Sequence, residues 1–404
     1  MGNEGIAGIE LLVILLAIAV VVAIAVAKVS SRLPIPYSVA LVIAGFAISL
    51  AGPGLHIEIT HELILAVLIP GLVFEAAYKL HLDELRRAFP VVAVLAVPGV
   101  AVTAGVVGAV VSAVTGLELP LAFLLGAIVC ATDPVAVIAI FKRLRAPASL
   151  TTVVEAESLL NDGTGVVLFG IALTAVTTHV GIADGLATFA IAVAASTLLG
   201  LSAGFVGVRV MNLVDDRLVE VMASVVVAYG TYLVAEHFHQ SGIIATVVAG
   251  MVIGNTGARW TLPEITTQAL DTVWEFIAYL LTAVVFLLVG VAITPGDLAV
   301  ALPVIVVGYL AMTAARAAIV YGVIGIGQRL GPPGVRLSLG YQHVMFWAGL
   351  RGAIAVALVL ALPPDLPQRH LIAGGVFGIV LVTLLVQGTT AGWVVRRAGV
   401  LTAD

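Results

Sequence analysis

The side chains best suited to chemistry in this sequence lie in two polar stretches inside long apolar runs. The first, Ala131–Pro134, reads ATDP, and the second, Glu157–Gly163, reads ESLLNDG. A carboxylate is costly to place in hydrocarbon, so an ionisable residue within such a run is by default a candidate functional residue. Asp133 and Asp162 are therefore the central acids of a candidate site.

These two acids are expected to lie at a similar depth on neighbouring helices. Asp133 lies 13 residues before a tight turn near Ala146, and Asp162 lies 16 residues after it. At about 1.5 Å of rise per residue, both carboxylates are about 20 to 24 Å from that turn. Arg351 lies 15 residues after Arg336, which marks the same side of its own apolar run. Three charges from distant parts of the chain should therefore share one layer.

The second stretch forms one polar stripe if it is helical. Glu157 and Asn161 are four residues apart, as are Ser158 and Asp162, and this spacing places each pair on one helix face. Carboxylate, hydroxyl and carbonyl oxygens are the ligands that hard cations such as Na⁺ take. No His or Cys joins the cluster, so a zinc or copper site is not expected. The stripe therefore favours a site for a hard cation.

Buried charges can also pair for structural reasons. A buried arginine needs a partner, and we expect Arg351 to pair with Glu157. One arginine cannot neutralise three carboxylates, which favours a direct role for Asp133 and Asp162. Arg316 lies about 12 residues from the nearer end of its apolar run. It either reaches the same layer or only braces the helices.

Composition indicates a membrane protein. Of the 404 residues, 61% are hydrophobic and only 10% are charged, whereas a soluble domain carries roughly 25% charged residues. The single cysteine, Cys130, excludes an internal disulfide and a cysteine-rich metal site.

Apolar runs long enough to cross a bilayer recur along the chain, and thirteen spans are expected. They cover residues 6–27, 36–51, 61–79, 89–114, 119–142, 150–178, 182–210, 217–236, 240–255, 268–293, 298–326, 336–361 and 370–395. With this count, one side of the membrane receives every Lys and Arg except Arg316, Arg351 and Arg369. Lys and Arg favour the cytoplasmic side, so the N-terminus is expected outside and the C-terminus in the cytoplasm.

An odd number of spans permits two inverted six-helix repeats, with the seventh span between them. Secondary transporters commonly have such repeats, and their sites lie at mid-membrane where corresponding helices are broken. Pro134 breaks the fifth span and would free a backbone carbonyl near Thr132, while Gly349–Gly352 interrupts the twelfth. The expected fold is thus an all-α integral membrane protein whose broken helices cross at mid-membrane.

The motifs resemble those of the NhaP-type branch of the cation/proton antiporters, which is related to the animal sodium/proton exchangers. The resemblance is carried by ATDP, ESLLNDG, the sequence GLRG at Gly349–Gly352 and FEA at Phe74–Ala76, and it covers nearly the whole chain. It implies a homodimer in which each chain has a core domain and an interface domain. The implied parts are interface domain 1–88 and 213–294, core domain 89–180 and 295–397, linking helix 181–212 and a short cytoplasmic end 398–404.

The resemblance also implies roles for the site residues. Asp133, Asp162, Ser158 and the backbone at Thr132 would bind the cation. Asn161 and Glu157 would hold the site together, with Glu157 paired to Arg351. The Asn161-Asp162 pair, in place of two adjacent aspartates, suggests electroneutral exchange of one cation for one proton.

The expected activity is exchange of Na⁺ or Li⁺ for H⁺ across the plasma or inner membrane by alternating access. A buried carboxyl group favours its protonated form, so Asp162 could release its proton when a cation binds. No cofactor, nucleic acid or enzymatic activity is expected. The alternatives are a K⁺/H⁺ antiporter of the same fold, an ion channel, and an intramembrane aspartyl protease built on Asp133 and Asp162. The protease is disfavoured because Gly163 and Gly165 follow Asp162, whereas that family's glycines precede the aspartate.

Overall fold

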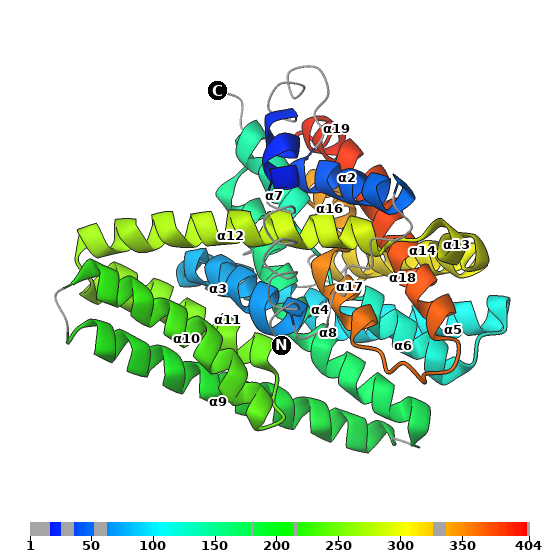
Figure 1. Cartoon of the computed structure of the whole chain (residues 1–404), viewed down its shortest axis with the longest axis horizontal. Coiled ribbons are helices and arrows are strands. Elements are labelled where there is room, and N and C mark those ends of the chain that lie inside the picture. The colour runs from blue at the N-terminus through cyan, green and yellow to red at the C-terminus, as the bar shows by residue number, and fades with distance from the viewer. Residues whose placement is uncertain are drawn as a thin grey trace.

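A computed structural model describes residues 17–25, 36–51, 63–178, 181–213, 216–325 and 337–401. These residues form helices and connecting segments and contain no strand (Figure 1). The labelled elements, with η marking π-helical stretches, are α2 (Tyr37–Ala51), η1 (Leu63–Leu68), α3 (Ile69–Lys79), α4 (Leu82–Ala96), α5 (Pro98–Thr115), α6 (Leu119–Val129), α7 (Val135–Leu144), α8 (Ala148–Thr177), α9 (Ile182–Met211), α10 (Arg217–His237), α11 (Gly242–Val252), η2 (Ile253–Thr261), α12 (Glu264–Ala292), α13 (Pro295–Val300), α14 (Leu302–Ala317), η3 (Ala318–Ile324), α16 (Leu339–Trp347), α17 (Ala353–Leu360), α18 (Arg369–Val382), η4 (Thr383–Gly388) and α19 (Thr389–Arg397).

The predicted all-α architecture is confirmed for the described residues. Seven helices among them are long and apolar enough to cross a membrane, and they cover Leu82–Thr115, Ala148–Thr177, Ala183–Met211, Arg217–His237, Glu264–Ala292, Leu302–Ile324 and Arg369–Arg397. Three shorter apolar helices cover Tyr37–Leu50, Leu119–Val129 and Gly242–Gly257. Residues 6–16 and 26–27 of the first expected span lie outside the described residues. The count of thirteen and the inverted repeats therefore stay predictions.

The helices pack in two groups. In the first group, α3 packs on α11 and α12, α2 packs on α12, and α10 packs on α11. In the second group, α4 and α6 pack on α8, α5 packs on α6 and α14, and α18 packs on α13 and α14. The long helices α9 and α10 lie side by side at one edge of the molecule (Figure 1).

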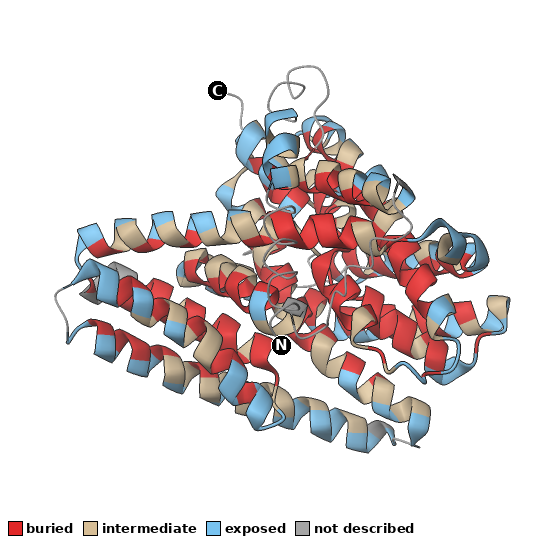
Figure 2. Ribbon diagram, viewed as in Figure 1, coloured by how far each residue is buried: buried red, intermediate tan, exposed pale blue. Residues whose placement is uncertain are grey.

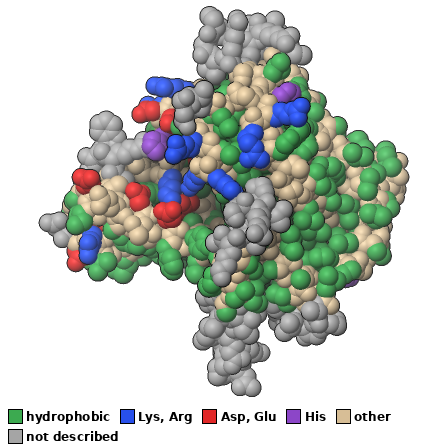
Figure 3. Space-filling view, turned by 90° about the horizontal axis from the view of Figure 1, so that it is seen from above, with side chains coloured by type: hydrophobic (Ala, Val, Ile, Leu, Met, Phe, Trp, Pro, Cys, Tyr) green, Lys and Arg blue, Asp and Glu red, His purple; other side chains and the backbone are tan. Residues whose placement is uncertain are grey.

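Burial and side-chain type fit a bilayer environment. Buried residues concentrate where the two groups meet, and exposed residues line the outer faces of the long helices (Figure 2). Those outer faces carry large apolar side chains, including Leu198 and Phe205 of α9 and Met222 and Val226 of α10. Charged side chains gather on one part of the face seen in Figure 3, and apolar side chains cover much of the rest. An apolar surface of this extent suits contact with lipid.

Two spans are broken at their centres, as the sequence predicts. Helix α6 ends at Val129 and α7 begins at Val135, while α16 ends at Trp347 and α17 begins at Ala353. The two non-helical segments touch, because the backbone N–H of Asp133 donates to the carbonyl of Leu350 over 2.8 Å. Pro134 explains the first break, since it cannot donate a backbone hydrogen bond and disfavours helix in the residue before it.

Candidate cation-binding site

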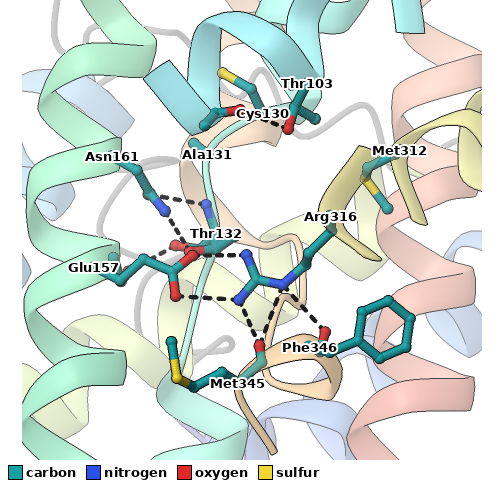
Figure 4. Close-up of polar contacts among 12 residues, drawn as sticks. Thr103, Cys130, Ala131, Thr132, Glu157, Asn161, Met312, Arg316, Met345 and Phe346 are labelled. Carbon is teal, nitrogen blue, oxygen red and sulfur yellow. Dashed lines mark hydrogen bonds and ion pairs between the residues drawn. The ribbon is translucent and has the colours of Figure 1, made fainter. Parts of the chain in front are cut away.

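The segment between α6 and α7 is fixed to α8 through Thr132. Asn161 accepts a hydrogen bond from the backbone N–H of Thr132 over 3.1 Å and donates its Nδ2 to the Thr132 hydroxyl over 2.6 Å. The hydroxyl of Ser158 donates to the Thr132 carbonyl over 2.6 Å. All of the polar groups of Thr132 are therefore engaged by α8, and the expected stripe on that helix faces the first break (Figure 4).

Asp133 joins the two broken helices. Its Oδ1 accepts from the backbone N–H of Val135 over 3.0 Å, and its Oδ2 accepts from the N–H of Ala353 over 3.2 Å. These residues begin α7 and α17, and the residue preceding each helix supplies no side-chain cap of its own. Helix N-termini carry partial positive charge, so one carboxylate stabilises both. The sequence reasoning assigned Asp133 to the cation and missed this capping role.

A glycine is required where the second break meets Asp133. A Cβ at Gly352 would overlap the Asp133 carboxylate. The backbone of the second break can therefore approach this acid closely only without a side chain at position 352. Gly352, as part of the GLRG sequence, could have been inferred to line the site, but its contact with Asp133 could not.

Asp162 and Asp133 line one cavity of about 390 Å³ together with Thr132 and Ser158. Asp162 is 9% exposed, and it interacts electrostatically with Asp133. The two acids predicted to share a layer therefore come together and face the same cavity. The cavity is also lined by Lys79, at the last turn of α3.

The expected pair between Glu157 and Arg351 is wrong. Glu157 instead binds Arg316 of α14 through two hydrogen bonds, from Nη1 to Oε1 over 2.6 Å and from Nη2 to Oε2 over 3.1 Å (Figure 4). Nη2 and Nε of Arg316 also donate to the carbonyl of Met345, and Nε to that of Phe346. Arg316 therefore reaches the layer and links α8 to the end of α16.

Arg351 is buried, but its side chain is bound by two backbone carbonyls and a methionine sulfur rather than by a carboxylate. Its Nη1 donates to Cys130 over 2.7 Å and to Ala131 over 3.0 Å, and its Nε donates to Met312 Sδ over 2.9 Å. The last carbonyls of a helix lack partners within that helix, so the end of α6 offers acceptors to a nearby guanidinium. Estimates of depth from the sequence favoured Arg351 over Arg316 as the partner of Glu157, and they could not reveal these carbonyl acceptors.

The oxygen atoms around the cavity suit a hard cation rather than a soft metal. The carboxylate of Asp162, the hydroxyl of Ser158, the carbonyl of Thr132 and the carboxylate of Asp133 lie on its walls or next to it. Such oxygens are the usual ligands of hard cations.

Paired broken helices beside buried carboxylates define a secondary transporter for cations. The family model described as "Sodium/hydrogen exchanger, transmembrane" matches residues 16–397. The chain belongs to this family, and its resemblance to NhaP-type antiporters is confirmed.

Characterised relatives agree with this assignment. The chain is 37% identical to the Na(+)/H(+) antiporter ApNhaP of Aphanothece halophytica, covering 99% of this chain and 77% of that protein. It is 34% identical to the Na(+)/H(+) antiporter NhaH of Halobacillus dabanensis, covering 91% and 93%. The sodium proton antiporter MjNhaP1 of Methanocaldococcus jannaschii has a similar fold, with a TM-score of 0.76 at 19% identity over 97% of this chain and 99% of that one. The relatives are transporters rather than enzymes.

Proposed function

We propose that this protein exchanges one Na⁺ or Li⁺ for one H⁺ across the membrane. The observation that carries the proposal is the shared cavity lined by Asp133 and Asp162. Both ApNhaP and NhaH are described as Na(+)/H(+) antiporters, which supports the same ion pair here. Cation and proton would compete for Asp162, with Ser158 and Thr132 supplying further oxygens.

The balance of charge around the site favours a one-to-one exchange. Three acids, Asp133, Glu157 and Asp162, and two arginines, Arg316 and Arg351, lie at the two helix breaks and on the α8 stripe that faces them. With all five ionised, the net charge is 2 − 3 = −1. One monovalent cation or one proton brings it to zero. A site that is neutral with either ion avoids moving net charge through the low-dielectric interior, where uncompensated charge is costly.

Alternating access is supported by an asymmetry around Asp162. The cavity reaches Lys79 and Lys142, which the charge distribution of the sequence assigns to the cytoplasmic side. On α11, Ile244 lies against Gly163, so closely that a Cβ there would overlap it. We infer that the structure is open toward the cytoplasm and that the α8–α11 contact closes the other side. Movement of the two helix groups would reverse this arrangement.

The expected setting is a homodimer in the plasma or inner membrane, with the N-terminus outside and the C-terminus in the cytoplasm. Cross-linking in native membranes would test the dimer. Protease protection of tags at the two ends would test the orientation.

The decisive test is transport by the purified protein in vesicles loaded with a pH-sensitive dye. Addition of Na⁺ or Li⁺ to the wild type should drive proton movement, and Asp162→Asn should abolish it. Asp271→Asn is a matched control, because Asp271 is an exposed acid of α12 outside the cavity. Sodium-driven proton flux retained by Asp162→Asn would refute the proposal. Flux driven by K⁺ alone would favour a K⁺/H⁺ antiporter, and single-channel currents would indicate a channel.

A further inference from the structure

Two of the segments that connect the helix groups are only two residues long. Leu80 and His81 join α3 of the first group to α4 of the second, and Ile293 and Thr294 join α12 of the first group to α13 of the second. Each linker has only two residues between helices. Any movement of one group against the other must therefore be absorbed at such points, where a few backbone dihedrals can change.

The helices on both sides of the first linker are tightly held. A Cβ at Gly254 would overlap the carbonyl of Tyr78, so the end of α3 lies directly on η2. On the other side, Glu84 of α4 accepts a hydrogen bond from Thr152 of α8, and Thr164 of α8 donates to the carbonyl of Ala96 over 2.6 Å. Helix α4 is thus fixed to the helix that carries Asp162, while α3 is fixed to the other group.

Asn255 of η2 clamps the first linker from both directions. Its Oδ1 accepts from the N–H of Leu82, the first residue of α4, over 2.9 Å. Its Nδ2 donates to the carbonyl of Leu80, at the end of α3, over 2.9 Å, and to Met251 over 2.9 Å. The side chain is 8% exposed. His81, the residue just before α4, provides no side-chain cap. Asn255 of η2 therefore caps α4 from a different helix.

The second linker has a corresponding clamp. Ser49 of α2 donates its hydroxyl to the carbonyl of Ile293 over 2.9 Å. Helix α2 approaches α12 as closely as η2 approaches α3, because a Cβ at Gly290 would overlap the carbonyl of Val42. In the predicted repeats, the spans that contain Ser49 and Asn255 are the second of each half, and the linkers follow the third. The span count places the two linkers on opposite sides of the membrane.

We propose that these two linkers are the hinges of the transport movement, and that Asn255 and Ser49 are positioning residues that hold them. The proposal rests on the exchange activity proposed above. Neither residue lines the cavity that contains Asp162. Their loss should therefore change how fast the groups move without changing how the site binds its ion.

The test compares Asn255→Ala and Ser49→Ala with the wild type in dye-loaded vesicles over a range of Na⁺ concentrations. Asn255→Ala should lower turnover about five-fold or more, and Ser49→Ala about two-fold or more, with the apparent KM for Na⁺ within about two-fold of wild type. Thr231→Val is the control, because Thr231 of α10 is buried and its hydroxyl has no hydrogen-bond partner among the described residues. It should transport like the wild type.

Hydrogen exchange gives a second readout. Amides of residues 80–88 should exchange faster in Asn255→Ala than in the wild type or in Ser49→Ala, because only Asn255 holds the N–H of Leu82. Wild-type turnover in both variants, or a KM that rises as turnover falls, would overturn the proposal. If Asn255→Ala does not fold, the turnover and KM of Ser49→Ala, which removes only one oxygen atom, test the proposal. Absence of sodium-driven flux in the wild type would instead refute the exchange activity, and hydrogen exchange would still test the clamp.

Discussion

Asp133 and Ala353 are 220 residues apart in the chain, yet the carboxylate of the first accepts a hydrogen bond from the backbone N–H of the second. The same carboxylate caps α7. Asp133 is therefore both a wall of the ion cavity and the joint between two broken helices. This double role separates its expected behaviour from that of Asp162.

Asp133→Ala should lower both transport and stability. Loss of a helix cap costs about 0.5–2 kcal/mol, and this substitution removes two. Asp162→Asn should abolish transport but leave the melting temperature in detergent equal to or above that of the wild type, because it removes a buried charge. Thermal unfolding of both variants by intrinsic fluorescence measures the difference. Equal melting temperatures for the two variants would contradict the capping role.

The pair of Glu157 and Arg316 predicts a specific rescue. Glu157→Leu alone should destabilise the protein by about 3–5 kcal/mol, because it leaves a buried guanidinium without its partner. Adding Arg316→Met should recover most of that loss, since both charges are then absent. The matched double variant, Glu157→Leu with Arg351→Met, should show no recovery. Recovery in the double variant with Arg351→Met instead would indicate that Glu157 pairs with Arg351, as the sequence analysis expected.

Competition between cation and proton predicts the pH dependence of transport. As the pH falls, a larger fraction of Asp162 is protonated, and Na⁺ must displace that proton to bind. The apparent KM for Na⁺ should therefore rise, by up to about ten-fold per pH unit where one proton competes, while the maximal rate with saturating Na⁺ changes little. Measurement with equal pH on both sides of the vesicle isolates this effect. A KM independent of pH would contradict competition at one site.

The close approach at the second break predicts strong sensitivity at Gly352. Gly352→Ala places a methyl group against the Asp133 carboxylate, so it should displace that acid and reduce transport by about ten-fold or more. Gly105→Ala is the control, because nothing lies within 4 Å of a Cβ added there in helix α5. That substitution should be neutral or stabilise by up to about 1 kcal/mol. Normal transport by Gly352→Ala would show that this contact is dispensable.

The sequence predicted which polar stretches converge, because apolar run lengths and proline positions constrain helix ends and depth. It placed Asp133, Asp162 and the Asn161 stripe around one point, and the structure confirms their convergence. It predicted the wrong arginine for Glu157, Arg351 in place of Arg316. That choice depends on helix rotation and on free carbonyls at the end of α6, and neither has a signature in residue spacing. The capping role of Asp133 was likewise hidden, because Ala353 contributes only its backbone.

The burial of Cys130 has a practical consequence. Its thiol is the single sulfhydryl of the chain, is 3% exposed, and donates to the carbonyl of Ala127. Maleimide reagents should therefore not label Cys130 in the folded protein. Cysteines introduced in pairs on the outer surfaces of α4 and α10 would then accept spin labels or fluorophores without prior removal of the native residue. Distances between such labels, recorded with and without sodium, would report directly how the two helix groups move relative to each other.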